Sequence, residues 1–360
     1  MSLRAFVRAR ARALRVALVF VPLAACRGAL DQSALAPRGP QATGIFHLGA
    51  FATTVATVFY VATLLALALA FRRANRRGRS GRGTAAAVRD DLAREDVAHE
   101  AGDQRPMRRG VSSGMAATLA AQLVFLGYDL SVGRTLNNPG VKNPITVEVV
   151  GHQWWWEVRY ADTSAHDRFT TANEVHIPVG RPIRFILTAR DVIHSIWVPN
   201  LGGKKDLVPG YQQELWFQAD TAGVYRGQCA EFCGAQHAKM ALLVIAEPPA
   251  EYERWVRQQR EPAQASVDST EKVGEAVFMS GSCAMCHAIS GTQAGSVAAP
   301  DLTHLASRRT LAAGTIPNTR GNLAGWIVDP QRIKPGNHMP PNALSSSELE
   351  ALLTYLQSLK

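Results

Sequence analysis

The sequence predicts a multi-domain membrane protein with a hairpin of two transmembrane helices, an all-β domain and a smaller C-terminal domain. Two apolar segments, 45–71 and 111–132, are the candidates for crossing a bilayer. Short runs of alternating apolar residues, broken by Gly and Pro, fill residues 144–247, which is typical of a β-sandwich or barrel. A Cys-x-x-Cys-His motif at 283–287 then marks a third domain, 270–360.

The positive charge of the chain lies beside its apolar segments. The formal net charge is +10, yet residues 111–360 carry 21 basic and 22 acidic groups. Residues 1–26 hold five Arg and no acidic residue, and residues 72–110 hold eleven Arg against six acidic residues. Basic residues in these positions indicate membrane topology. We therefore expect a membrane partner and no nucleic acid.

Residues 1–26 have the pattern of a signal peptide, with an Arg-rich start followed by an apolar stretch that is too short to span a bilayer. The run Leu23-Ala24-Ala25-Cys26 resembles a bacterial lipoprotein processing site, which predicts a lipid on Cys26. The alternative is an ordinary cleavage site and a free thiol. The chain has five Cys; two pairs fit the motifs described below, so Cys26 is the odd one.

The predicted hairpin follows a periplasmic N-terminal segment, 27–44. Ile45–Phe71 contains no Asp, Glu, Lys or Arg, and several Arg residues begin at Arg72, so the positive-inside rule places that end in the cytoplasm. Residues 72–110 form the predicted Arg-rich cytoplasmic loop. The second span, 111–132, is less apolar, but it is needed to bring the remaining domains back to the outer side.

The β-domain begins at Ile145, where apolar and polar residues alternate. Further strands are predicted at 175–179, 183–187, 214–217, 224–228 and 241–246. Three consecutive Trp residues, 154–156, interrupt the pattern. Because neighbouring side chains on a strand point to opposite faces, they cannot all be buried on one side, and we expect at least one to be exposed.

Four side chains with metal-binding chemistry lie close together in the β-domain: Cys229, Cys233, His237 and Met240. Thiolate and thioether are soft ligands, and imidazole suits copper, zinc and iron. His194 lies upstream in a fitting context, and two bridging thiolates can hold two metals. A disulfide between the two cysteines and a zinc site are the alternatives, although zinc rarely binds Met.

The run C-x-E-x-C-x-x-x-H-x-x-M, with the upstream D-V-I-H-S, resembles the dinuclear copper (CuA) domain of cytochrome c oxidase subunit II over residues 144–247. The resemblance implies a cupredoxin Greek key and two copper ions. It assigns their ligands as His194, Cys229, Cys233, His237, Met240 and the backbone carbonyl of Glu231. It also implies a magnesium ion at the Glu231 side chain, at the contact with subunit I, and it makes Trp154 the residue where electrons arrive.

Residues 248–269 are predicted to form a linker with one short helical piece at 252–259, long enough to let the next domain swing.

In the C-terminal domain, Cys283 and Cys286 have the spacing for covalent attachment of haem c, with His287 as an iron ligand. A chance redox or zinc pair is the alternative. For the sixth iron ligand we favour Met339, in a Pro/Gly-rich loop, over His304 and His338. Residues 345–359 have the apolar spacing of a helix.

The C-terminal segment resembles a class I cytochrome c, which implies an all-α fold. Together the resemblances imply the subunit II–cytochrome c fusion of a caa-type haem-copper oxidase. Such a subunit passes electrons from its haem c to copper and on to subunit I, which reduces oxygen to water. They imply subunits I and III as partners, a soluble or membrane cytochrome c or an upstream complex as donor, and location in the bacterial inner membrane with both metal domains on the periplasmic side.

Two other functions also involve a membrane-anchored copper-binding protein. A membrane-anchored nitrous oxide reductase or related denitrifying enzyme also has such a copper pair, but it would need a large second copper domain. A lipoprotein that stores or delivers copper would have little use for covalent haem on the same chain.

Overall fold

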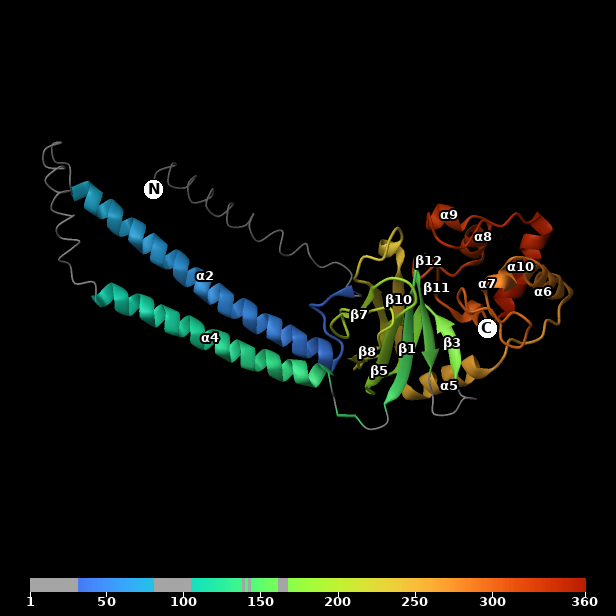
Figure 1. Ribbon diagram of the computed structural model, residues 1–360, viewed down its shortest axis with the longest axis horizontal. Coiled ribbons are helices and arrows are strands. Elements are labelled where there is room, and N and C mark those ends of the chain that lie inside the picture. The colour runs from blue at the N-terminus through green and yellow to red at the C-terminus, as the bar shows by residue number, and fades with distance from the viewer. Residues whose placement is uncertain (1–31, 81–104, 138–139, 142–143, 161–167) are drawn as a thin grey trace, which may run out of the picture. The chain divides into compact units, whose positions relative to one another are not determined.

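The computed structural model describes residues 32–80, 105–137, 140–141, 144–160 and 168–360 (Figure 1). The chain forms two units, one over residues 44–136 and the other from the segment before residue 44 together with residues 137–360. The predicted signal peptide 1–26, its lipidation site Cys26 and residues 81–104 of the predicted cytoplasmic loop lie outside the described residues.

Two long helices, α2 (Pro40–Ser80) and α4 (Arg105–Asn137), account for the helical unit. Within them, residues 40–76 and 108–136 have mean hydropathies of 2.2 and 1.4, so by length and composition both helices could cross a bilayer. Phe51 of α2 stacks on Phe125 of α4 at 6.4 Å between ring centroids. Both helices extend beyond the predicted spans, and Arg72 and Arg73 continue α2.

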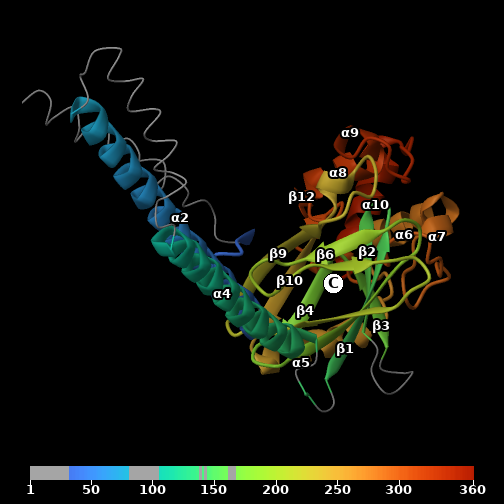
Figure 2. The ribbon, with the colours of Figure 1, turned by 60° about the vertical axis from the view of Figure 1, so that its left-hand side comes forward.

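The β-domain consists of two five-stranded sheets, with strand orders β3-β2-β1-β5-β8 and β4-β10-β9-β6-β7 (Figure 2). The strands of the first sheet are β1 (Ile145–His152), β2 (Trp155–Tyr160), β3 (Phe169–Ala172), β5 (Ile183–Ala189) and β8 (Gln213–Phe217). Those of the second are β4 (Glu174–Pro178), β6 (His194–Trp197), β7 (Lys205–Leu207), β9 (Gly223–Cys229) and β10 (Ala241–Glu247). The predicted β-sandwich of cupredoxin type is confirmed.

The alternation of the sequence decides which face of each strand is buried. In β5 the side chains of Ile183, Phe185 and Leu187 are completely buried, while the residues between them are partly exposed. β9 shows the same alternation, and buried residues of β1, β5 and β9 form one apolar core between the sheets. This continuous core fixes the strand ends from which the loops at the end of the sandwich extend.

The predicted linker contains a packed helix, α5 (Pro249–Arg260). Trp255 stacks on His176 at 4.0 Å between ring centroids and meets Tyr160 edge-on, and Tyr252 is buried. The helical piece expected at 252–259 is thus confirmed and extends over 249–260, and its packing leaves a shorter connection than the flexible linker expected over 248–269. The aromatic face of α5 packs on the β-domain. Residues 261–268 therefore form the connection between α5 and the next helix, α6.

The C-terminal domain is helical, with a small two-stranded sheet. Its elements are α6 (Ser269–Ser280), α7 (Cys283–Cys286), β11 (Thr310–Leu311), β12 (Ile316–Pro317), α8 (Arg320–Val328), α9 (Pro330–Ile333) and α10 (Ser346–Ser358). α6 and α10 pack closely: a Cβ on Gly274 would lie 2.1 Å from the carbonyl oxygen of Ala351, so only glycine fits. The predicted closing helix is confirmed as α10, which begins with a capping box formed by Ser345 and Glu348.

Candidate metal centres

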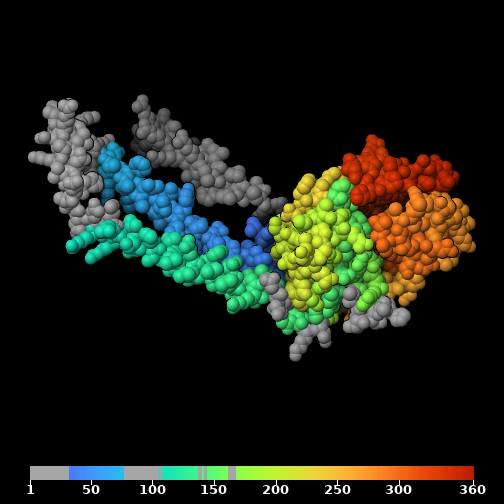
Figure 3. Space-filling view, viewed as in Figure 1, coloured from blue at the N-terminus to red at the C-terminus, as the bar shows by residue number. Residues whose placement is uncertain are grey.

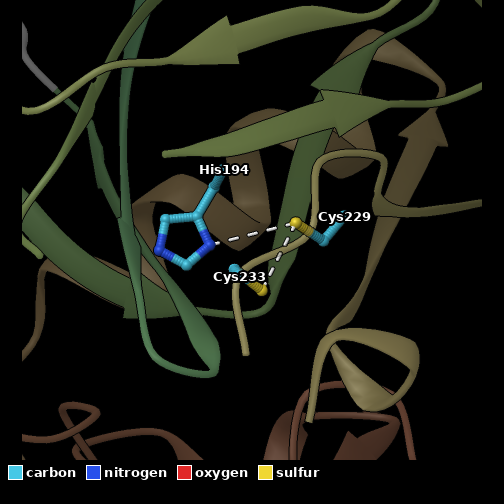
Figure 4. A group of neighbouring side chains, drawn as sticks. All are labelled: His194, Cys229 and Cys233. Atoms are coloured by element: carbon cyan, nitrogen blue, oxygen red, sulfur yellow. Dashed lines mark hydrogen bonds between the residues drawn. The ribbon is translucent and has the colours of Figure 1, made fainter. Parts of the chain in front are cut away.

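The predicted copper ligands meet at one end of the sandwich. His194 begins β6, Cys229 ends β9, and Cys233 lies in the loop that follows (Figure 4). Their ligand atoms all lie within 4.8 Å of one another, and all three side chains are buried. The sulfurs of Cys229 and Cys233 are 3.8 Å apart, and Nδ1 of His194 lies 3.9 Å from the Cys229 sulfur.

The remaining predicted ligands lie around the same two sulfurs. Nδ1 of His237 is 3.7 Å from the Cys233 sulfur, and the Met240 sulfur is 3.8 Å from it. The carbonyl oxygen of Glu231 accepts from the Cys229 thiol at 3.2 Å, while the Glu231 side chain is exposed. Gly234, with φ of +109°, turns the loop so that Cys233 and His237 face the same point.

This donor set fits a copper pair better than the two alternatives. Both cysteines are free thiols. The thioether of Met240 is fully buried beside Cys233, and zinc sites rarely include such a ligand. Thiolate, imidazole and thioether together are the ligands that copper prefers.

The electrostatics of the cluster also favour a cation. The neighbouring thiol of Cys233 lowers the pKa of Cys229 by hydrogen-bonding to its ionised form, although burial opposes this. The same bond to the Cys229 thiolate raises the pKa of Cys233, because a second negative charge beside the first is unfavourable. Two thiolates this close together therefore need positive charge between them, which metal ions supply.

Asp191 is a functional residue to which the sequence analysis assigned no role, although it lies three residues before His194. Its carboxylate accepts from Nε2 of His194 at 2.8 Å, which leaves Nδ1 facing the sulfurs. Burial opposes ionisation of Asp191, but hydrogen bonds from His194 and two backbone N–H groups lower its pKa to about 2. Burial alone would lower the pKa of His194, and the bond to Asp191 raises it overall. The carboxylate thus orients the ligand ring.

Trp154 lies directly beside the copper cluster. Its indole N–H donates to the carbonyl oxygen of Cys233 at 2.9 Å. The expectation that at least one of the three tryptophans is exposed is wrong: Trp154 and Trp156 are buried and Trp155 is half-buried. The reason is tertiary, because the ring of His338 from the C-terminal domain covers Trp154 at 5.5 Å between centroids.

The Cys-x-x-Cys-His motif opens onto a cavity of about 270 Å³. Cys283, Cys286, His287 and Met339 all line it. Both cysteines are free, as covalent haem attachment requires. The walls are largely apolar, with Phe278, Leu323 and Trp326 among the lining residues, and they suit a flat apolar ring.

The histidines of the domain differ in what their nitrogens contact. Nδ1 of His287 bonds the carbonyl oxygen of Pro300 at 2.7 Å, which leaves Nε2 for iron. Burial lowers the pKa of His287, so the ring stays neutral and able to ligate. Both ring nitrogens of His304 bond backbone carbonyls, those of Lys360 and Glu261, and His304 is not among the cavity-lining residues. His304 therefore does not suit the sixth position.

Met339 lies in the cavity wall within a loop fixed by side-chain bonds. Its N–H donates to Asn337 and its carbonyl oxygen accepts from Gln331, both at 2.8 Å. His338 also lines the cavity, but its ring packs against Trp154 at an interplanar angle of 49°. This arrangement favours Met339 as the sixth ligand.

A cupredoxin sandwich with a thiolate pair, joined to a cytochrome-type domain with a haem-binding motif, defines a class of electron-transfer proteins with a copper and a haem centre. Comparisons with known proteins agree. Residues 162–247 match the family described as "Cytochrome C oxidase subunit II, periplasmic domain", and residues 272–360 match "Cytochrome c".

Several curated relatives are named "Cytochrome c oxidase subunit 2". The protein from Alkalihalophilus pseudofirmus is 42% identical over 61% of this chain and 62% of its own length, so the chain spans less than two thirds of that relative. The protein from Bacillus sp. strain PS3 is 33% identical over 67% of this chain and 70% of its own. The chain belongs to the cytochrome c oxidase subunit 2 family, in the form with a C-terminal cytochrome c domain.

Among solved structures, the chain is similar to the periplasmic domain of subunit II of cytochrome oxidase from Bradyrhizobium japonicum. The sequence identity is 32%, over 33% of this chain and 96% of that one, with a TM-score of 0.32.

Proposed function

We propose that this chain is the electron-carrying subunit II of a membrane cytochrome c oxidase, and that it relays electrons from its cytochrome domain to its copper domain. The observation that supports this most is the position of Trp154. Its indole bonds the backbone of the copper-ligand residue Cys233, and its ring lies against His338, next to Met339 in the haem cavity.

The chain's own residues would hold two cofactors. Two copper ions would be bound by His194, Cys229, Cys233, His237, Met240 and the Glu231 carbonyl, and haem c by Cys283, Cys286, His287 and Met339. When bound, each centre takes up and releases one electron at a time. The exposed Glu231 side chain is available for a magnesium ion at the subunit I contact.

The protein surroundings favour fast transfer with little rearrangement. His194, Cys229, Cys233 and Met240 are almost completely buried, and they are attached to strands or to a loop braced by Gln153 and Trp154, which both donate to the Cys233 carbonyl. Rigid ligands that exclude water keep the geometry similar in both oxidation states.

We place the protein in the bacterial inner membrane, anchored by α2 and α4, with both metal domains on the periplasmic side. Its partners would be subunit I, whose haem-copper site reduces oxygen to water, and subunit III. The electron donor would be a soluble or membrane cytochrome c or an upstream complex.

A nitrous oxide reductase is disfavoured because the domain after the sandwich matches a cytochrome c over residues 272–360. A copper-delivery role is disfavoured for the same reason, since release of copper does not require haem.

We expect Trp154→Ala to slow haem-to-copper transfer by about tenfold or more, because it removes both the contact with His338 and the bond to Cys233. Rapid-mixing spectroscopy of the purified complex measures this rate. Trp216→Ala is the matched control, since Trp216 is also 8% exposed but belongs to β8. Transfer at the wild-type rate in Trp154→Ala, with both metals bound, would show that electrons reach the copper domain elsewhere.

We expect Cys26→Ala to block lipoprotein processing and leave a longer chain in the membrane. Membrane association should change little, because two spanning helices anchor more strongly than acyl chains. Mass spectrometry of the mature N-terminus checks this, and an unmodified residue other than Cys26 at that position rules out lipidation.

A further inference from the structure

The cytochrome domain is fastened to the copper domain through the segment 333–338, here called the anchor segment. Lys334 donates to the carbonyl oxygen of Trp154 at 2.8 Å. The carbonyls of Pro335 and Ile333 accept from Gln236 and Lys239, which lie in the copper-ligand loop. The anchor segment thus contacts both Trp154 and the loop that carries the copper ligands.

Lys334 is buried, with 3% of its surface exposed. Its ammonium bonds two carbonyls, that of Trp154 in the copper domain and that of Ala312 in the cytochrome domain at 3.2 Å. Burial, together with the nearby charge of Lys239, lowers the pKa of Lys334 to about 7. A buried ammonium is costly unless its hydrogen bonds are satisfied, and here one of them depends on contact between the domains.

A second contact between the domains involves residues 309–313, the segment whose Ala312 carbonyl also accepts from Lys334. The buried carboxylate of Glu174, at the start of β4, accepts from the backbone N–H groups of Arg309 and Thr310 at 2.8 and 3.0 Å. Beside it, the N–H of Ala241 donates to the carbonyl of Ala313 at 3.0 Å. Glu174 therefore satisfies donors that belong to the cytochrome domain.

The copper domain also forms part of the haem cavity itself. Gln153, Trp154, Trp155 and Asn173 line the cavity together with residues of the cytochrome domain. Residues 310–313 and Lys334, which lie at the contacts with the copper domain, also line the cavity. Figure 3 shows the surfaces of the two domains meeting along a continuous boundary. A freely swinging cytochrome domain would open this cavity.

We propose that Lys334 and Glu174 clamp the cytochrome domain onto the copper domain, so that the copper domain completes the wall of the haem site. The fused cytochrome then works from one docked position. Lys334 is a positioning residue in this arrangement, because it acts through the backbone of Trp154. The role of this docking in electron transfer rests on the proposed function, whereas the docking itself can be tested without electron transfer.

The test uses the purified oxidase complex with the full chain, with hydrogen exchange followed by mass spectrometry. In Lys334→Met we expect the amides of Arg309, Thr310 and Ala241 to exchange at least about tenfold faster, because the contact opens more often. Lys272→Met is the control, since Lys272 is exposed on α6. Covalent haem and copper content should match the wild type in both variants.

Glu174 supplies an independent variant pair. Glu174→Ala removes the acceptor and should raise exchange at Arg309 and Thr310 likewise, whereas Glu174→Gln keeps a side-chain carbonyl and should restore most of the protection. Unchanged exchange in both Lys334→Met and Glu174→Ala would overturn the clamp. The proposed function would fail separately, if a wild-type complex with both metals bound showed no haem-to-copper transfer.

Discussion

Replacing Cys229 or Cys233 with serine is expected to abolish the dinuclear copper centre. The two cysteine sulfurs lie 3.8 Å apart and the other predicted ligands surround them, so removal of one thiolate leaves a single thiolate to bridge two metals. The copper-loaded wild type should show a hyperfine pattern in which one electron is shared by two equivalent copper nuclei. Either variant should lose this pattern and bind at most one copper ion.

Ser195→Ala is the matched control for the cysteine variants. Ser195 follows the ligand His194 and is completely buried, and within the described part of the chain its hydroxyl has no hydrogen-bond partner. Its removal should leave the copper content unchanged. A single-copper spectrum from the fully loaded wild type would refute the dinuclear centre.

Met339→His is expected to keep the covalent haem and lower its reduction potential. Methionine ligation raises the potential of cytochrome haems, and axial ligands set it over a range of about 0.8 V. Attachment should survive, because Cys283, Cys286 and His287 belong to α7 and its C-cap, whereas Met339 belongs to the loop after α9. Redox titration of the purified complex measures the shift.

Met285→Leu is the control for this variant. Met285 also lines the cavity, but it lies within the attachment motif and is 70% exposed. The haem potential of this control should stay close to that of the wild type. If Met339→His left both the potential and the sulfur-to-iron absorption band unchanged, Met339 would not be the sixth ligand, and His338 would become the candidate.

Local sequence carried most of the information about the two centres. A haem-attachment motif needs only five consecutive residues, and Cys229, Cys233, His237 and Met240 lie within one loop and a short helical turn. Alternation along the strands predicted which side chains form the β-core, because the pleat alone determines the face on which each residue lies. The β-sandwich and the closing helix could therefore be predicted from local patterns of apolar residues.

Interactions between distant segments could not be predicted in this way. The packing of α5 against the β-domain, the burial of Trp154 beneath His338 and the buried Lys334 all depend on surfaces that meet only after folding. A lysine before a Pro-Gly pair looks like an ordinary loop residue, since nothing nearby in sequence indicates that its partner is the carbonyl of Trp154, 180 positions away. The groups that can bind copper and haem are predictable from the sequence, because ligand chemistry and short spacing are local properties. How the two centres face each other becomes visible only in the folded molecule, because docking depends on the shape and hydrogen-bonding groups of two complete domains.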